Sequence, residues 1–257
     1  MQMYRKCLLV AVATLAFTTG AFAVDEVKKL KMGVEGAYPP FNSLDASGQA
    51  VGFDVEIGNA LCAKMKVECE VVVTPWNEMI PSLIVGNYDF IMSSMSITEE
   101  RSKRVDFTSP YYSNKLQFIA PKTSDINTDP ASIKDSLRGK TIGTQNETVS
   151  ATWLQKNLGE EVTIKLYDTQ ASAYADLAAG HLDAILADKY PSYEWLKSDA
   201  GMSFEFKGNP VDDNDKIGIA VRQSDPLRAS LNLAIKEIIE DGSYKKINDK
   251  YFPFSIL

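Results

Sequence analysis

Short β-branched apolar runs alternate with amphipathic helical segments along this chain, and this alternation limits its fold more than any other feature. The first half predicts strands over 28–34, 69–76 and 90–98, with helices between them over 53–66 and 77–86. Repeated strand–helix–strand units form parallel sheets with helices packed on their faces. The sequence therefore predicts an α/β fold.

A second unit of the same kind follows, and no Gly/Ser-rich or Pro-rich linker separates the two. It ends with a predicted strand over 216–222 and a long helical tail over 224–252. In open α/β sheets, ligands bind beyond the carboxyl ends of the strands. We therefore expect the segments that follow strands to face one cleft, and these are 35–41, 74–76, 93–101, 144–150 and Asp188.

The first residues have the features of a secretory signal peptide. Arg5 and Lys6 give a basic start, residues 8–17 form a short apolar run, and residues 21–23 read Ala-Phe-Ala, a cleavage signal. We therefore expect residues 1–23 to be removed and the mature chain to be exported. The whole chain has a net charge of −7, which argues against a nucleic-acid partner.

Two cysteines, Cys62 and Cys69, remain after the predicted cleavage. Export places them in an oxidising compartment, where disulfides form and persist. A single short connection separates the two residues, which favours a Cys62–Cys69 disulfide. The alternative is a pair of buried free thiols.

The stretch 91–112, IMSSMSITEERSKRVDFTSPYY, ends an apolar run in hydroxyl side chains and places Arg101 shortly after them. A guanidinium is a planar fork of donors that suits a carboxylate. Ser96 and nearby main-chain N–H groups add neutral donors, and the helix expected after Thr98 turns its amino end toward an anion. This pattern predicts a carboxylate site. The alternative for Arg101 is a surface ion pair with Glu99 or Asp106.

Three further side chains are candidates for a ligand site. Asp188 ends a predicted strand, so its carboxylate can hold an ammonium group; the alternative is that it caps the helix expected over 190–199. Tyr38 and Trp76 lie on two predicted loops, where they can enclose a flat or aliphatic side chain and stack on a cation. The alternative for each aromatic residue is a place in the core.

Several longer motifs follow one another in a fixed order. They are GFDVEIGNALCAKM at 52–65, IPSL at 80–83, SSMSIT at 93–98, RVDFT at 104–108, DLAAGHLDAILAD at 176–188 and DGSYKKINDKYF at 241–252. Through these motifs the chain resembles the family 3 bacterial solute-binding proteins, which serve ABC importers, over nearly the whole mature sequence. Within that family, GVEGAYPPF at 33–41 is similar to the arginine/ornithine binders in the lysine/arginine/ornithine- and histidine-binding branch.

The resemblance implies a two-lobed periplasmic-binding-protein fold of type II. Each lobe would be a mainly parallel sheet flanked by helices, and two hinge strands would join the lobes. Lobe 1 would comprise 24–112 and 214–257, and lobe 2 would comprise 113–213. Because the chain would cross between the lobes twice, this division also explains the missing linker.

The resemblance also implies how the α-carbon end of an amino acid would be held. Arg101 and Ser96 would bind the α-carboxylate, with the main chain near Thr148 closing from lobe 2. Asp188 would bind the α-ammonium, helped by the Ser94 main chain and Ser96. One zwitterion would thus bridge both lobes.

For the ligand side chain, the resemblance makes Tyr38 and Trp76 the walls of the pocket. Glu35 would lie deepest, with Ser93, facing a side-chain cation. The loop at 143–150 departs from the family pattern, because Gln145 replaces an apolar residue near the ligand side chain. This change favours a ligand with a longer polar tail, including an opine.

The function implied is a periplasmic, monomeric substrate-binding component of an ABC importer for arginine, ornithine or lysine, with histidine as a further candidate. It would close around a small-molecule amino acid and work with an inner-membrane permease, without a cofactor or a metal. An opine-binding protein of the same family is one alternative. A cyclohexadienyl-dehydratase-like enzyme is another, with Glu35 as its proton donor, and a sensory module acting through a membrane partner is a third.

Overall fold

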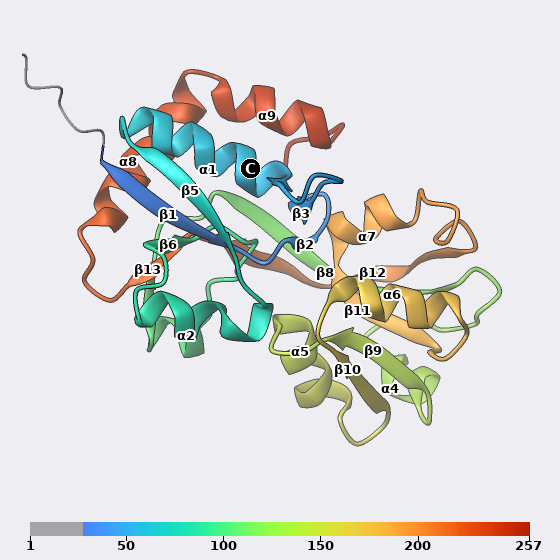
Figure 1. Cartoon of the computed structure of the whole chain (residues 1–257). Helices are drawn as coiled ribbons and strands as arrows, with labels where there is room; N and C mark the ends of the chain where they lie inside the picture. The colour runs from blue at the N-terminus through green and yellow to red at the C-terminus, as the bar shows by residue number, and fades with distance from the viewer. Residues whose placement is uncertain (1–27) are drawn as a thin grey trace, which may run out of the picture.

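Two five-stranded sheets, each flanked by helices, form the two lobes of the molecule (Figure 1). The computed structural model describes residues 28–257, so the predicted signal peptide, residues 1–23, lies outside the described residues. Among residues 28–257, no helix is both long enough and apolar enough to cross a membrane. The architecture is α/β, as the alternation of strands and helices predicts.

In the first sheet β13 runs opposite to the other four strands, because it pairs antiparallel with both of its neighbours while β1 pairs parallel with β5 and β6. Apolar residues form one core between this sheet and α1, α8 and α9, and a second core under α2 on the opposite face (Figure 1). In sheet order the strands are β5 (Glu68–Val73), β1 (Lys29–Val34), β6 (Phe90–Ile91), β13 (Ala220–Arg222) and β7 (Val105–Phe107), and the helices are α1 (Phe53–Lys64), α2 (Met79–Ile84), α8 (Leu227–Glu240) and α9 (Ser243–Tyr251).

The second sheet repeats this plan, with β8 as its one reversed strand. One apolar core lies under α4 and α5, and the other lies under α6 and α7. In sheet order the strands are β10 (Thr163–Tyr167), β9 (Thr141–Gln145), β11 (Ala184–Asp188), β8 (Tyr112–Pro121) and β12 (Phe204–Ile217), and the helices are α4 (Ile133–Leu137), α5 (Val149–Leu158), α6 (Gln170–Ala178) and α7 (Lys189–Trp195).

Two long strands, β8 and β12, connect the lobes (Figure 1). They pair antiparallel with each other, from Tyr112 opposite Ile217 to Phe204 opposite Pro121. The end of β12 also bridges to Ser96 in the first lobe. The predicted lobe limits, 112/113 and 213/214, fall at the start of β8 and within β12, and their placement stays a prediction.

Some elements are shorter or more divided than the sequence patterns predict. The strand expected over 90–98 is only two residues long, because the chain leaves the sheet after Ile91. The tail expected as one helix divides into α8 and α9 at Gly242, whose φ of 81° ends the first helix. The strand expected over 216–222 divides between β12 and β13. A small sheet before α1 comprises β2 (Ala37–Tyr38), β3 (Asn42–Leu44) and β4 (Ala50–Val51).

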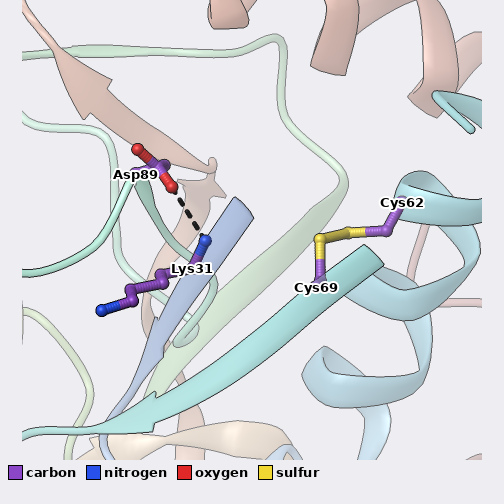
Figure 2. Close-up of a disulfide and its surroundings, with 4 residues drawn as sticks. All are labelled: Lys31, Cys62, Cys69 and Asp89. Atoms are coloured by element: carbon purple, nitrogen blue, oxygen red, sulfur yellow. Dashed lines mark hydrogen bonds between the residues drawn. A yellow bond between two sulfur atoms is a disulfide. The ribbon is translucent and has the colours of Figure 1, made fainter. Parts of the chain in front are cut away.

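The predicted disulfide is confirmed: Cys62 on α1 is bonded to Cys69 on β5 (Figure 2). The bond ties the helix to the edge strand of the first sheet. In the same region, the main-chain N–H of Lys31 donates to Asp89 at 2.8 Å and so fixes the segment before β6 against β1 (Figure 2). Both contacts hold the strands whose ends carry the site described below.

We expect replacement of both cysteines by serine to lower the free energy of unfolding by about 2.5 kcal/mol, the chain entropy of a closed loop of about eight residues. Urea denaturation of the wild type and the Cys62→Ser/Cys69→Ser variant measures the difference. Reduced wild type is the control and should match the variant. Equal stability of all three would refute the predicted stabilisation, and two alkylatable thiols in the native protein would refute the disulfide itself.

Candidate functional site

A pocket of about 320 Å³, a volume that includes space open to solvent, lies between the lobes. It is formed where the carboxyl ends of strands from both sheets face each other, as expected for open α/β sheets. All residues predicted for the ligand site line it: Glu35, Tyr38, Trp76, Ser93, Ser94, Ser96, Arg101, Gln145, Thr148 and Asp188, together with Val149. The structure therefore brings the predicted set together, and their contact with a ligand stays a prediction.

Strand ends place the central residues of this pocket. Glu35 follows β1, Trp76 begins the short 3₁₀ helix η1 (Trp76–Glu78) after β5, and Ser93 follows β6. Gln145 is the last residue of β9, and Asp188 is the last residue of β11. Because each side chain follows a strand of a packed sheet, the sheets fix their relative positions.

The guanidinium of Arg101 lies at one end of the pocket. It donates to the carbonyl oxygens of Ser96 and Glu147, both at 2.9 Å, and its central carbon lies 5.2 Å from the centroid of the Trp76 ring. Glu147 belongs to the second lobe, so Arg101 already contacts both lobes. Two of the five guanidinium N–H donors make these bonds, which leaves donors for an anion.

The alternative interpretation of Arg101, a surface ion pair, does not fit its surroundings. Glu99 pairs with Lys103 at 3.5 Å, and Asp106 pairs with Arg228 at 3.4 Å. Burial lowers the pKa of Arg101, partly offset by the charges of acidic neighbours. A partly desolvated guanidinium of this kind is suited to pair with a carboxylate.

The amino end of the helix that carries Arg101 offers less to an anion than the sequence suggested. This helix, α3 (Glu99–Ser102), is only four residues long, and the Thr98 hydroxyl accepts a hydrogen bond from the Arg101 main-chain N–H at 3.1 Å. The helix end is therefore already capped by a side chain. The Arg101 side chain is therefore the main candidate donor for an anion at this place.

Asp188 lies at the side of the pocket formed by the second lobe. The Tyr38 hydroxyl, from the first lobe, donates a hydrogen bond to its carboxylate. Burial, and then the nearby charge of Asp215, raise the pKa of Asp188 well above its usual range. Asp188 precedes α7, but its side chain makes no capping hydrogen bond there. The carboxylate therefore faces the pocket and does not act as a helix cap.

Two residues of the hinge strands support this end of the pocket, and sequence reasoning missed both. Asp215 on β12 accepts hydrogen bonds from the Ser96 hydroxyl and the Asn114 amide, each at 3.1 Å. A hydroxyl has one donor and two acceptor lone pairs. Because Ser96 donates to Asp215, it presents acceptor lone pairs to the pocket. Asp215 and Asn114 come together only through the pairing of β8 with β12. No local sequence motif therefore predicts their role.

Glu35 lies at the opposite end of the pocket and is 7% exposed. Burial raises the pKa of Glu35 to about 7, although a hydrogen bond from Gln145 opposes the shift. The Gln145 amide reaches it across the lobes at 2.7 Å. The Glu35 main-chain N–H donates to the Ser93 hydroxyl at 2.9 Å. Ser93 therefore orients the residue whose carboxylate faces the pocket.

A fully buried carboxylate, Asp54, holds two of the loops that line the pocket. It accepts hydrogen bonds from the amide of Asn42 at 2.9 Å and from the hydroxyls of Ser94 at 2.8 Å and Tyr111 at 2.7 Å. Burial nevertheless raises the pKa of Asp54 to about 6. The Asn42 oxygen in turn accepts from the main-chain N–H of Gly36 at 2.9 Å.

This network explains how Ser94 keeps its unusual backbone. Ser94 has a φ of 51°, a left-handed conformation that non-glycine residues adopt rarely and at a cost. The bond to Asp54 fixes the residue there. The sequence offered one signal for Asp54, an acidic residue in the first turn of a helix between the buried Phe53 and Val55.

Comparisons with known proteins agree with this geometry. A model of the bacterial extracellular solute-binding proteins, family 3, matches residues 30–254. The L-arginine-binding protein of Pseudomonas aeruginosa is 39% identical over 99% of this chain and 98% of its own length. The lysine/arginine/ornithine-binding periplasmic protein of Escherichia coli K12 is 37% identical over 97% of this chain and 95% of its own. A solved structure of an ancestral arginine-binding protein bound to arginine matches with a TM-score of 0.81 and 30% identity, covering 87% of this chain and 98% of that one.

Proposed function

Because the chain belongs to the bacterial extracellular solute-binding proteins of family 3, we propose that it binds cationic L-amino acids for an ABC importer. Arginine, ornithine and lysine are the proposed ligands. The protein acts in the periplasm as a monomer and delivers its ligand to an inner-membrane permease. The relatives reported above are binding proteins by name, which supports a binding role without catalysis.

The charges of the pocket are the observation that carries this proposal. It contains one guanidinium, from Arg101, and two carboxyl groups, from Asp188 and Glu35. Arginine, ornithine and lysine each bring one carboxylate and two cationic groups, which is the complementary set. Burial raises the pKa of both carboxyl groups. For Asp188 the Arg101 charge offsets this rise only in part, so a ligand cation would compensate each group for the lost water.

In the proposed complex, Arg101 binds the α-carboxylate together with main-chain N–H groups near Thr148. Asp188 binds the α-ammonium, and Ser96 accepts a hydrogen bond from the same group. The main chain of Ser94 also binds the α-ammonium. A zwitterion held in this way contacts both lobes, so binding shifts the population toward the closed form.

The ligand side chain then runs between Tyr38 and Trp76 toward Glu35. The aromatic rings cover its aliphatic part and attract the cation. Glu35 pairs with the terminal cation, and Ser93 holds the main chain of Glu35 in place. An ionised Glu35 therefore distinguishes a cationic side chain from a neutral one of the same shape.

We expect the affinity for arginine to fall as the pH falls from 8 to 5. Burial raises the pKa of Glu35 to about 7, and Glu35 must be charged opposite the ligand cation. Below pH 7 a proton must therefore leave on binding, which costs up to about tenfold in affinity for each pH unit. Calorimetry at pH 5, 6.5 and 8 measures the trend, and two buffers of different ionisation heat show the released proton. An affinity independent of pH would contradict an ionised Glu35 in the complex.

A thermal-shift screen of the common amino acids, with ornithine, citrulline and octopine added, tests the proposed ligand class. A ligand at about 100 times its dissociation constant adds about 2.7 kcal/mol of stability. Arginine, lysine or ornithine should give the largest shift. A larger shift with octopine would support an opine-binding protein, and shifts only with neutral or acidic amino acids would refute the proposal.

The buried Glu35, with its raised pKa, is also the feature that a cyclohexadienyl-dehydratase-like enzyme would use as a proton donor. Incubation with arogenate, followed by analysis for the dehydrated product, distinguishes this enzymatic function from the proposed binding function. We expect no product, because Glu35 accepts a hydrogen bond from Gln145 and is matched to a cation. Product formation that Glu35→Gln abolishes would establish an enzyme.

A further inference from the structure

A second cavity, here called the outer chamber, adjoins the Glu35 end of the ligand pocket. It holds about 970 Å³, including space open to solvent, and shares Glu35 and Trp76 with the ligand pocket as lining residues. The proposed ligand ends at Glu35, so its terminal nitrogen would lie at the boundary between the two cavities.

Side chains form this boundary. The Gln145 amide donates both to the Glu35 carboxylate at 2.7 Å and to the main-chain oxygen of Asp168, which lines the outer chamber, at 3.1 Å. Glu35 comes from the first lobe and Gln145 from the second. A change of rotamer at Glu35 or Gln145 would break the hydrogen bond between them and open the boundary between the two cavities.

The outer chamber has an acidic lining. Its charged residues are Glu35, Glu78 and Asp168, and the other residues of the described chain that line it are uncharged. Neutral or cationic groups are therefore compatible with it, whereas an anionic group would meet like charges without a compensating base.

The α-carbon end of the pocket does not offer an equivalent extension. A groove also lies beyond Arg101, but a ligand that extended there through its carboxyl group would lose the charge that Arg101 binds. At the α-nitrogen, Asp188 is already in contact with Tyr38 of the other lobe. An extension from the terminal side-chain nitrogen keeps all three charged groups of the ligand paired and points it toward the outer chamber.

We propose that the site also takes cationic amino acids that carry a small neutral or cationic substituent on the terminal side-chain nitrogen. The substituent passes Gln145 into the outer chamber, while Glu35 keeps the charge of the nitrogen paired. This inference rests on the proposed function, because it places the terminal nitrogen of the ligand at Glu35. Gln145, the departure from the family pattern, becomes the residue that controls access to the chamber.

Calorimetric titration of the wild type with arginine, asymmetric dimethylarginine and argininosuccinate tests the proposal. Dimethylarginine keeps the guanidinium charge and adds two methyl groups, and argininosuccinate adds carboxylates at the same end. We expect dimethylarginine to bind within about tenfold of arginine and argininosuccinate to bind more than about a hundredfold weaker. Gln145→Ala should shift the ratio toward dimethylarginine by about threefold or more, and Gln155→Ala, at an exposed glutamine outside both cavities, should leave it unchanged.

The outcomes separate the two proposals. If arginine, lysine and ornithine all fail to bind, the proposed function fails, whereas binding of lysine or ornithine without arginine overturns only the inference about the outer chamber. If arginine binds and dimethylarginine loses more than about tenfold, the boundary at Glu35 is closed and the present inference fails while the proposed function stands. Argininosuccinate binding as tightly as dimethylarginine would overturn the charge selection of the chamber. The wild-type comparison needs no variant, so it remains decisive even if Gln145→Ala does not fold.

Discussion

Replacing Arg101 with alanine is expected to weaken arginine binding by about 2–5 kcal/mol, which is roughly 30- to 5,000-fold. The change would leave the ligand carboxylate buried without its counter-charge. The fold should persist, because within residues 28–257 the guanidinium donates only to the carbonyl oxygens of Ser96 and Glu147, and those oxygens can accept from water in an open cleft. Calorimetry measures the affinity, and a melting curve without ligand confirms folding.

Arg138→Ala is the matched control for this variant. Arg138 lies on the surface of the second lobe and pairs with Asp135 at 2.8 Å, outside the pocket. We expect it to bind arginine like the wild type. A loss of less than about tenfold in Arg101→Ala would mean that the ligand carboxylate lies elsewhere.

The second large effect concerns Glu35→Gln. Glutamine keeps the shape of the side chain and can still accept the hydrogen bond from Gln145, but it removes the negative charge. Arginine should bind about 2–5 kcal/mol weaker, because its buried cation would lose its partner. Citrulline, with a neutral side chain of nearly the same shape, should lose far less, so the preference for arginine should narrow or reverse.

Titrating arginine and citrulline against the wild type and Glu35→Gln separates a charge effect from a loss of structure. Glu70→Gln is the matched control, because Glu70 is an exposed residue of β5 outside the pocket. Equal weakening of both ligands in Glu35→Gln would remove the cationic-ligand proposal and leave amino-acid binding intact.

The sequence predicted well those features that depend on local pattern. The alternation of strands and helices predicted the α/β fold, and the convergence of strand ends predicted that Glu35, Trp76 and Asp188 would face one pocket. The spacing of Cys62 and Cys69, in an exported chain, predicted the disulfide. In each case the signal is local in the sequence: the periodicity of one segment, a residue at the end of a strand, or two cysteines seven positions apart.

The features that the sequence did not predict depend on pairing between distant segments. Asp215 meets Ser96 only because β12 returns to the first lobe beside β8. Tyr38 meets Asp188 only when the two lobes face each other. The short β6 was also missed, because an apolar and hydroxyl-rich run has strand propensity even where the chain must turn out of the sheet at Ser94 to line the pocket.

Calorimetric titration of the wild type with arginine and three analogues, each lacking one charge, tests the central claim most directly. Agmatine lacks the carboxylate paired with Arg101, the deamino analogue lacks the ammonium paired with Asp188, and citrulline lacks the side-chain charge paired with Glu35. We predict saturable binding of one arginine per chain, with each analogue weaker by about 2–5 kcal/mol. An analogue that binds as tightly as arginine, or the absence of any arginine binding, would contradict a pocket that pairs all three charges of a cationic amino acid.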